Sequence, residues 1–244
     1  MKRTIRKEAR RQWVRAAASL LTLGAGASIA GGIGAALAAG AGRPAAPASA
    51  NAAGNGAALR TLLVLGDSLS AEYGLARGTG WVALLEKRLA ERAPGWNVVN
   101  ASISGETTAG GATRISSLLE KHEPAAVVVE LGGNDALRGL DLNATRRNLE
   151  RMVGASQKAG AKVLLLGMQV PPNYGKAYTD AFAQIFVDVA KAHRTPLVPF
   201  FLEGVADDMA LFQPDRIHPN GQAQPRMLEN VWPALEPLLR AARR

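Results

Sequence analysis

The amino-acid sequence predicts an α/β protein, a three-layer α/β/α sandwich built around a parallel sheet of five strands. Short apolar runs alternate along the chain with longer amphipathic stretches, and the runs are hydrophobic at consecutive positions. Strands that are apolar on both faces are typical of parallel sheets covered by helices on each side. The length of 244 residues and the 48% share of hydrophobic residues suit one medium domain with a substantial core.

Residues 1–50 read as an export signal ahead of this domain. The first fifteen residues are basic, 16–41 carry no charge, and the segment ends on Ala-Ser-Ala at 48–50. A basic region, an apolar region and a small-x-small end, in this order, are typical of a secretory signal. We therefore expect cleavage after Ala50.

The composition of this leader favours removal over anchoring. Its uncharged stretch exceeds the roughly 18 residues that suggest a membrane span. Its Gly and Ala content nevertheless makes it weakly hydrophobic. The Arg-Arg-Gln-Trp-Val segment that begins at Arg10 resembles a twin-arginine signal, with Ala9 where Ser or Thr is usual. We expect a periplasmic or secreted mature protein without stable membrane anchoring after cleavage.

Charge and cysteine content exclude several classes of function. The chain has no cysteine, which removes disulfides, thiolate nucleophiles and cysteine-bound zinc. The net charge is +9, but residues 1–50 hold eight basic residues and one acidic residue. The rest of the chain holds 21 basic and 19 acidic residues, so it offers little support for a nucleic-acid partner.

The mature chain reads as a junction followed by one domain. Residues 51–58 are rich in Gly, Ala and Asn and predict a flexible junction, and 59–244 form the domain, with no internal repeat. Apolar runs predict strands at 62–65, 98–99, 125–131, 163–167 and 197–200. Amphipathic stretches predict helices near 80–92, 112–121, 143–159, 178–193 and 222–240.

Polar residues follow each predicted strand at the point where the strand ends. In such sheets, functional groups gather outside the carboxyl ends of the strands. The polar segments are 66–68, 100–107, 132–135, 169–174 and 214–220. Five segments that are far apart in the sequence are therefore expected to meet at one rim of the sheet.

The first of these segments raises the question of what Ser68 does. The residues around it read V-L-G-D-S-L-S, where a buried strand stops at a glycine and an acid and a serine follow. The lipase-type motif G-x-S-x-G and the phosphate-binding motif G-x-x-x-x-G-K-[ST] are both absent. This stretch alone leaves three roles open for Ser68, namely a nucleophile, a phosphate-binding hydroxyl and a helix cap.

A serine nucleophile needs a base, normally a histidine that an acid orients. Of the three histidines, His122 and His193 fall at the predicted ends of helices, where a cation complements the helix dipole. His218 follows Asp215 by three residues on a rim segment, so one turn of chain can bring the carboxylate to one ring nitrogen. The other ring nitrogen is then free to accept the serine proton.

An oxyanion also needs hydrogen-bond donors. Gly105 can bring its backbone N–H close to a substrate because it has no side chain, and Asn134 follows two glycines from which its amide can reach the same space. Each also has an ordinary reading, as a turn glycine and as an asparagine that stabilises a turn.

Four separated blocks, GDSLS, SGET, GGND and DRIHPN, resemble in this order the GDSL or SGNH hydrolases. The stretches LVLGDSLSAEYG, VELGGNDALRGL and PLVPFFLEGV are similar to a bacterial periplasmic branch of acyl-CoA thioesterases, lysophospholipases and arylesterases. The resemblance implies a flavodoxin-like sheet and neither a metal nor a cofactor. It implies Ser68 as the nucleophile, His218 as the base held by Asp215, and Gly105, Asn134 and the Ser68 N–H as oxyanion donors.

The resemblance also implies small acyl esters or thioesters as substrates, and Asp67 as a support of the turn rather than of the reaction. The segment 72–77, after the GDSLS block, differs from that of another family member, which leaves the preferred acyl chain open rather than the chemistry. A sugar O-deacetylase of the same fold is an alternative, although aromatic residues make up only 5% of the chain. A non-catalytic binder is a further alternative, but it has no need of the Asp215 and His218 pair.

Apolar residues on the rim segments predict how an acyl chain is held. Together they are expected to line an apolar trough that leads to Ser68. Anchoring of the loops to the core is the ordinary alternative for each of them. The expected lining residues are Leu75, Ile103, Leu137, Leu140, Pro171, Pro172, Tyr174 and Ile217.

Overall fold

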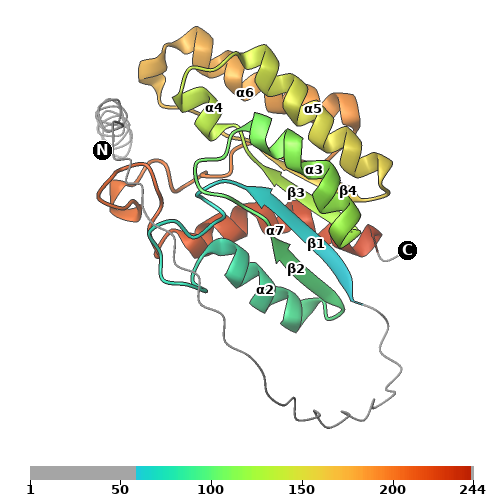
Figure 1. Ribbon diagram of the computed structural model, residues 1–244. Helices are drawn as coiled ribbons and strands as arrows, with labels where there is room; N and C mark the ends of the chain where they lie inside the picture. Colours follow the sequence, from blue (N-terminus) through green and yellow to red (C-terminus); the bar gives the residue numbers. More distant parts are fainter. Residues whose placement is uncertain (1–58, 243–244) are drawn as a thin grey trace, which may run out of the picture.

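The computed structural model describes residues 59–242, so the export signal and the junction expected at 1–58 lie outside the described residues. Within 59–242, five parallel strands form one sheet in the order β2-β1-β3-β4-β5 (Figure 1). The strands are β1 (Arg60–Gly66), β2 (Trp96–Asn100), β3 (Ala126–Glu130), β4 (Lys162–Leu166) and β5 (Leu197–Val198). The parallel five-stranded sheet predicted from the apolar runs is therefore confirmed.

The central strands are apolar at consecutive positions because both faces of the sheet are covered. In β1, Leu63 and Val64 point to opposite faces and both are fully buried. Val64 pairs with Val128 of β3 on one side and with Asn100 of β2 on the other. The sheet thus changes from buried apolar residues to polar residues at its carboxyl edge.

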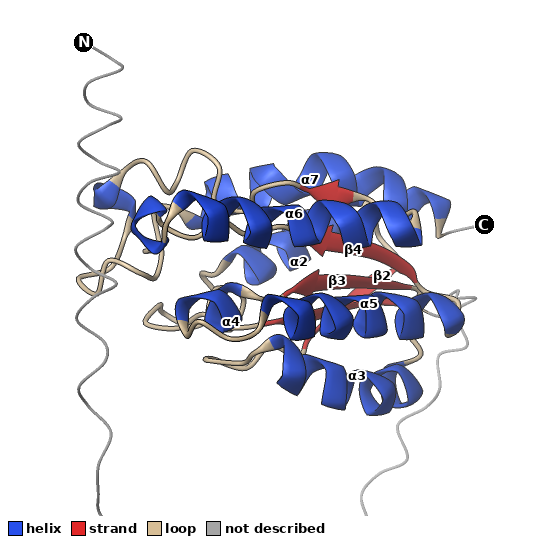
Figure 2. Cartoon of the chain, turned by 90° about the horizontal axis from the view of Figure 1, so that it is seen from above, coloured by secondary structure: helices blue, strands red, loops and turns tan. Residues whose placement is uncertain are grey.

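Helices on both faces complete a three-layer sandwich. One face carries α2 and α7, and the other carries α3, α5 and α6 (Figures 1 and 2). The long helices are α2 (Trp81–Arg92), α3 (Thr108–His122), α5 (Leu142–Lys158), α6 (Lys176–His193) and α7 (Gln224–Ala241). In the described part of the chain, no helix combines the length and the apolar character needed to span a membrane.

The strand order creates a crevice at the end of β1. From β1 the chain crosses to β2 on one side, and from β2 it returns to β3 on the other side of β1. The loops that leave neighbouring strands in opposite directions open a crevice at the carboxyl edge, which is where ligands bind in such sheets. Ser68 lies two residues beyond the end of β1 and therefore lies at this crevice.

The short helices and the start of α3 differ from the sequence prediction. The pattern did not indicate α4 (Gly133–Leu137), nor the 3₁₀ turns η2 (Pro172–Tyr174) and η3 (Met209–Leu211), because each is too short to show a periodicity. Helix α3 begins at Thr108, earlier than the predicted start near 112, and therefore includes Gly111. A Cβ at Gly111 would come within 2.4 Å of Leu131, so this glycine allows close packing of the helix on the sheet side.

Candidate active site

Ser68 lies in a tight turn that follows β1, and it does not cap a helix. The next helix, α2, begins only at Trp81, and Gly80 stands at its N-cap, so the helix-cap reading is wrong. Asp67 Oδ1 accepts the backbone N–H of Leu69 at 3.0 Å, and the Asp67 carbonyl oxygen accepts the N–H of Ser70 at 3.2 Å. Asp67 therefore supports the turn, as the family resemblance implies.

His218 and Asp215 meet Ser68 in the arrangement that the spacing predicts. His218 Nε2 lies 2.9 Å from Ser68 Oγ, and His218 Nδ1 lies 2.7 Å from Asp215 Oδ2. Asp215 Oδ1 also accepts the backbone N–H groups of Ile217 at 2.9 Å and of His218 at 3.0 Å. One carboxylate thus shapes the loop and orients the imidazole ring at the same time.

Hydrogen bonds keep Asp215 ionised. Partial burial acts to raise its pKa, but the N–H groups of His218 and Ile217 and the His218 ring outweigh this effect and lower the pKa below 3.8.

The ring of Tyr73 packs against the His218 ring with centroids 4.4 Å apart. Arg216, between the acid and the histidine, has a φ of 60° in the left-handed region that non-glycine residues rarely adopt.

Gly105 lies in the loop after β2 and Asn134 lies in α4, and a hydrogen bond from Asn134 to Glu106, next to Gly105, joins the two segments. Gly105 has a φ of 78°, and its carbonyl oxygen accepts a hydrogen bond from Arg138 at 3.0 Å. Asn134 lies in the first turn of α4, and its Nδ2 donates to Asp67 Oδ2 at 2.9 Å and to the Glu106 carbonyl oxygen at 3.0 Å. The side chain of Glu106 pairs with Arg114, which fixes the loop that carries Gly105.

A buried acidic pair lies beneath the serine turn, and the sequence did not predict it. Burial is the main cause that raises the pKa of Asp67 from 3.8 to about 7 and the pKa of Glu130 well above its usual range. Glu130 Oε2 accepts the Ser70 hydroxyl at 2.7 Å, and Ser70 Oγ accepts the indole N–H of Trp81 at 3.1 Å. The only signal in the sequence is a charged residue, Glu130, at the end of an apolar run.

A cavity of about 710 Å³ opens at this site. Ser68, Asn134 and His218 line it, together with four of the residues expected for the apolar trough, Leu137, Pro171, Tyr174 and Ile217. The expected residues Leu75, Ile103, Leu140 and Pro172 are not among its lining residues. The sequence interpretation of the trough missed Leu69, Met168, Val170 and Leu202, which also line the cavity.

Two of the lining residues that the sequence interpretation missed lie in the segment after β4, whereas two of the residues that it expected are exposed. Met168 and Val170 lie two and four residues beyond the end of β4 and line the cavity. Ile103 and Leu140 are instead 49% and 42% exposed. Their role in binding an acyl chain stays a prediction.

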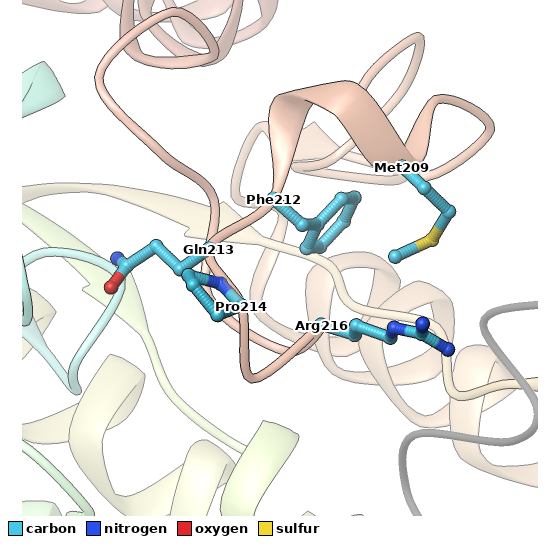
Figure 3. A pocket seen from close by; sticks show the side chains of 5 residues that line it. All are labelled: Met209, Phe212, Gln213, Pro214 and Arg216. Atoms are coloured by element: carbon cyan, nitrogen blue, oxygen red, sulfur yellow. The ribbon is translucent and has the colours of Figure 1, made fainter.

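A second, smaller cavity of about 410 Å³ lies on the histidine loop (Figure 3). Its lining residues are Met209, Phe212, Gln213, Pro214 and Arg216, and they do not include Ser68 or His218. In Figure 3 the Gln213 side chain points away from Met209 and Arg216. Gln213 Nε2 donates to the Tyr73 carbonyl oxygen at 2.8 Å and to that of Pro219 at 3.1 Å, so it braces the histidine loop against the serine turn.

The other two histidines lie where the sequence predicts them. His122 is the last residue of α3 and His193 is the last residue of α6. Neither lines either of the two cavities. Among residues 59–242, no cluster of three or more His, Asp and Glu side chains is arranged to hold a metal ion.

A family model for the GDSL-like lipase/acylhydrolase family matches residues 64–224, more than half of the chain. The chain belongs to this family. Proteins that resemble it include Esterase TesA of Pseudomonas aeruginosa, 56% identical over 183 residues, which are 75% of this chain and 91% of that protein. The Escherichia coli K12 protein named thioesterase 1/protease 1/lysophospholipase L1 is 43% identical over 75% of this chain and 86% of its own length.

The fold comparison agrees with the sequence comparison. A crystal structure of TesA superimposes with a TM-score of 0.72 at 55% identity, over 73% of this chain and 99% of the other. The chain is therefore an enzyme of the esterase and thioesterase type of the GDSL family with the fold of that family, and the non-catalytic binder is excluded.

Proposed function

We propose that this GDSL enzyme is a serine hydrolase that cleaves carboxylic ester and thioester bonds of acyl substrates through Ser68, His218 and Asp215. The observation that carries the proposal is the continuous chain of contacts from Asp215 Oδ2 to His218 Nδ1 and from His218 Nε2 to Ser68 Oγ. This chain gives the serine a base and gives the base an orienting acid.

The reaction follows from these contacts. His218 Nε2 takes the Ser68 proton while Oγ attacks the acyl carbonyl carbon. The negative charge moves to the carbonyl oxygen, which the N–H groups of Ser68 and Gly105 and the amide of Asn134 stabilise. The tetrahedral intermediate then collapses to an acyl-enzyme and expels the alcohol or thiol, which receives its proton from His218. Water, activated by His218, releases the acid in a second cycle.

The ionised state of Asp215 supports this assignment. A carboxylate with a pKa below its usual value stays negative at neutral pH and stabilises the imidazolium that forms on His218. It also holds the proton on Nδ1, so that Nε2 faces Ser68 as the acceptor. The apolar lining of the cavity beside Ser68, with Leu137, Met168 and Val170, suits the methylenes of an acyl chain.

Labelling and kinetics together test the proposal. An organophosphate reagent is expected to label the wild type at Ser68 alone, and Ser68→Ala to fold normally and lose esterase activity by several orders of magnitude. A panel of p-nitrophenyl esters and acyl thioesters from two to sixteen carbons then separates the candidates. Labelling at Ser70 or Ser104 would contradict the nucleophile, and activity that peaks at acetyl would favour the sugar O-deacetylase.

We also propose that the mature enzyme acts in the periplasm or outside the cell. The support is the sequence of residues 1–50, with its basic, apolar and small-residue regions. Cell fractionation and mass spectrometry of the mature N-terminus test this proposal. The expected result is a chain that begins after Ala50 in the periplasmic or culture fraction, and a cytoplasmic chain that retains residues 1–50 would contradict it.

A further inference from the structure

The carboxamide of Asn134 is engaged by acceptors from two different loops. Its Nδ2 donates to Asp67 Oδ2 at 2.9 Å and to the carbonyl oxygen of Glu106 at 3.0 Å. A carboxamide nitrogen carries two hydrogens, so these two bonds use both of them. The nitrogen end of the amide is thereby held between the serine turn and the loop after β2.

These two acceptors decide which end of the amide faces the serine turn. Nitrogen and oxygen occupy similar volumes in a carboxamide, so only hydrogen bonding distinguishes the two orientations. If the amide of Asn134 were turned over, its Oδ1 would face a carboxyl oxygen of Asp67 and the carbonyl oxygen of Glu106. Both hydrogen bonds would be lost and oxygen lone pairs would face each other, so the observed orientation is strongly preferred.

Asp67 connects this orientation to the turn that carries Ser68. Its Oδ1 accepts the N–H of Leu69, directly after Ser68, while its Oδ2 accepts the amide of Asn134. Asp67 is only 2% exposed, and its own backbone N–H donates to Glu130 Oε2 at 3.3 Å. One buried side chain thus fixes both the backbone beside Ser68 and the amide of Asn134, 67 residues away in the sequence.

We infer that Asp67 is a positioning residue for the oxyanion site, and that its carboxyl group fixes the amide of Asn134 with the nitrogen end directed at the serine turn. The inference rests on the proposed function, because only a reaction that forms an oxyanion uses this amide. It extends the role that the sequence predicts for Asp67, which is support of the turn alone. Asp67 does not touch the reacting atoms, and it acts through Asn134.

The hydrogen bonds of Asn134 must be redistributed as the oxyanion forms. A carbonyl oxygen that gains negative charge is a third acceptor for two amide hydrogens of Asn134. One hydrogen is then shared between the oxyanion and either Asp67 or the Glu106 carbonyl oxygen. The amide needs only a small shift to do so, because its nitrogen end is already held against the turn that carries Ser68. Preorganised donors of this kind account for much of the catalytic effect.

The Asp67→Asn variant tests the inference most sharply. An asparagine at 67 offers one oxygen and one NH₂ group in place of two carboxylate oxygens. If its oxygen keeps the N–H of Leu69, its NH₂ group faces Asn134 and favours the turned-over amide. Loss of one oxyanion donor costs about 10²–10³ in rate. The expected result is a fall in kcat of about 10- to 100-fold for an acyl ester, with little change in KM.

A double-mutant cycle separates positioning from general damage. If Asp67 acts through Asn134, then Asp67→Asn in an Asn134→Ala background lowers kcat no further than Asn134→Ala alone. Asp135→Asn is the matched control: it also alters a buried carboxylate, 2% exposed, whose partners are Thr108 and Thr145 rather than the amide of Asn134. Any effect of this control is expected to multiply with that of Asn134→Ala.

Labelling of Ser68 distinguishes failure of the positioning role of Asp67 from failure of the proposed function. Organophosphate labelling of Ser68 is followed in every variant, and absence of labelling in the wild type would contradict the nucleophile itself. If Ser68 is labelled but the effects of Asp67→Asn and Asn134→Ala multiply, the positioning role is wrong and the function stands. Asp67→Ala, which removes the acceptor without adding an amide, replaces Asp67→Asn in the cycle if thermal unfolding shows that the Asn variant does not fold.

Discussion

Two aspartates serve the same site with nearly the same hydrogen-bond pattern but in opposite charge environments. Asp215 accepts two backbone N–H groups and the His218 ring, and its side chain is 34% exposed. Asp67 accepts one backbone N–H and the amide of Asn134, and the residue is only 2% exposed. The pKa of Asp215 is lowered, whereas burial is the main cause that raises the pKa of Asp67 to about 7.

The difference shows that hydrogen bonds alone do not set the charge of a carboxyl group. In Asp215 the hydrogen bonds outweigh partial burial, and in Asp67 burial outweighs the hydrogen bonds. In the proposed mechanism, each outcome suits the role. Asp215 is negative beside an imidazole that gains positive charge, whereas burial disfavours a negative charge on Asp67, whose contact with the oxyanion site runs through Asn134.

The largest expected effect concerns His218, which lies on the same loop as Asp215. His218→Ala is expected to lower kcat/KM by about 10⁴-fold or more, because the base is lost. His122→Ala and His193→Ala, at the ends of α3 and α6, are expected to keep most of the activity. Steady-state hydrolysis of a p-nitrophenyl ester checks all three, and a large kinetic loss with unchanged stability in either control would contradict the assignment.

The next effect compares the two aspartates directly. Asp215→Asn is expected to lower kcat by about 10³- to 10⁴-fold, because an amide neither stabilises the imidazolium nor fixes the Nδ1 proton. This loss exceeds the 10- to 100-fold loss expected for Asp67→Asn. Kinetics of both variants on one ester provide the measurement. Equal losses would show that the two carboxyl groups do not have different roles.

The next effect is a gain in folding stability rather than a loss of activity, and it depends on pH. Because the pKa of Asp67 is about 7 in the folded state and near 3.8 when unfolded, the folded state keeps a proton between these values that the unfolded chain has lost. Stability from this group is therefore lost as pH rises from about 4 to 7. Relative to wild type, Asp67→Asn is expected to gain about 3 kcal/mol between pH 5 and pH 8.

Urea unfolding of both proteins at these two pH values measures the gain. Asp215→Asn serves as the control. The pKa of Asp215 is lowered on folding, so its ionised form stabilises the fold above the unfolded pKa and the benefit disappears only in acid. A gain from pH 5 to pH 8 in both variants, or in neither, would contradict the contrast between the two aspartates.

The smallest effect lies away from both carboxyl groups. Leu137 lines the large cavity on the edge of α4, and a charge there opposes burial of an acyl chain. Leu137→Asp is expected to reduce kcat/KM several-fold more for medium and long acyl esters than for acetyl esters. The acyl panel provides the check. An equal effect at every chain length would assign Leu137 to loop structure rather than to the chain-binding wall.

Much of this site could be predicted from the sequence because its main parts are local. The Asp215 and His218 contact spans three residues, and the strand ends that collect the polar segments follow from apolar runs in a parallel sheet. The helices that end at His122 and His193 carry an amphipathic pattern long enough to recognise.

The remainder depends on contacts that no local pattern encodes. The bond between Asp67 and Asn134 joins residues 67 apart, and Asn134 lies in a five-residue helix without a periodicity. The cavity wall needs the direction of each side chain at the end of β4, where Met168 and Val170 turn inward. Hydrophobicity alone did not distinguish these residues from the exposed Ile103 and Leu140.

The separation of 150 residues between Ser68 and His218 also has a consequence for biosynthesis. A chain that has been synthesised only as far as the middle of the sheet contains Ser68 but neither Asp215 nor His218, so the contact that the proposed mechanism needs is still missing. The site forms only when the histidine loop returns to β1 and α7 docks beside α2, where Gln224 accepts the N–H of Trp81 at 3.0 Å. Contacts of such long sequence separation form late and slowly. In the proposed mechanism, hydrolytic activity therefore appears only with completion of the fold.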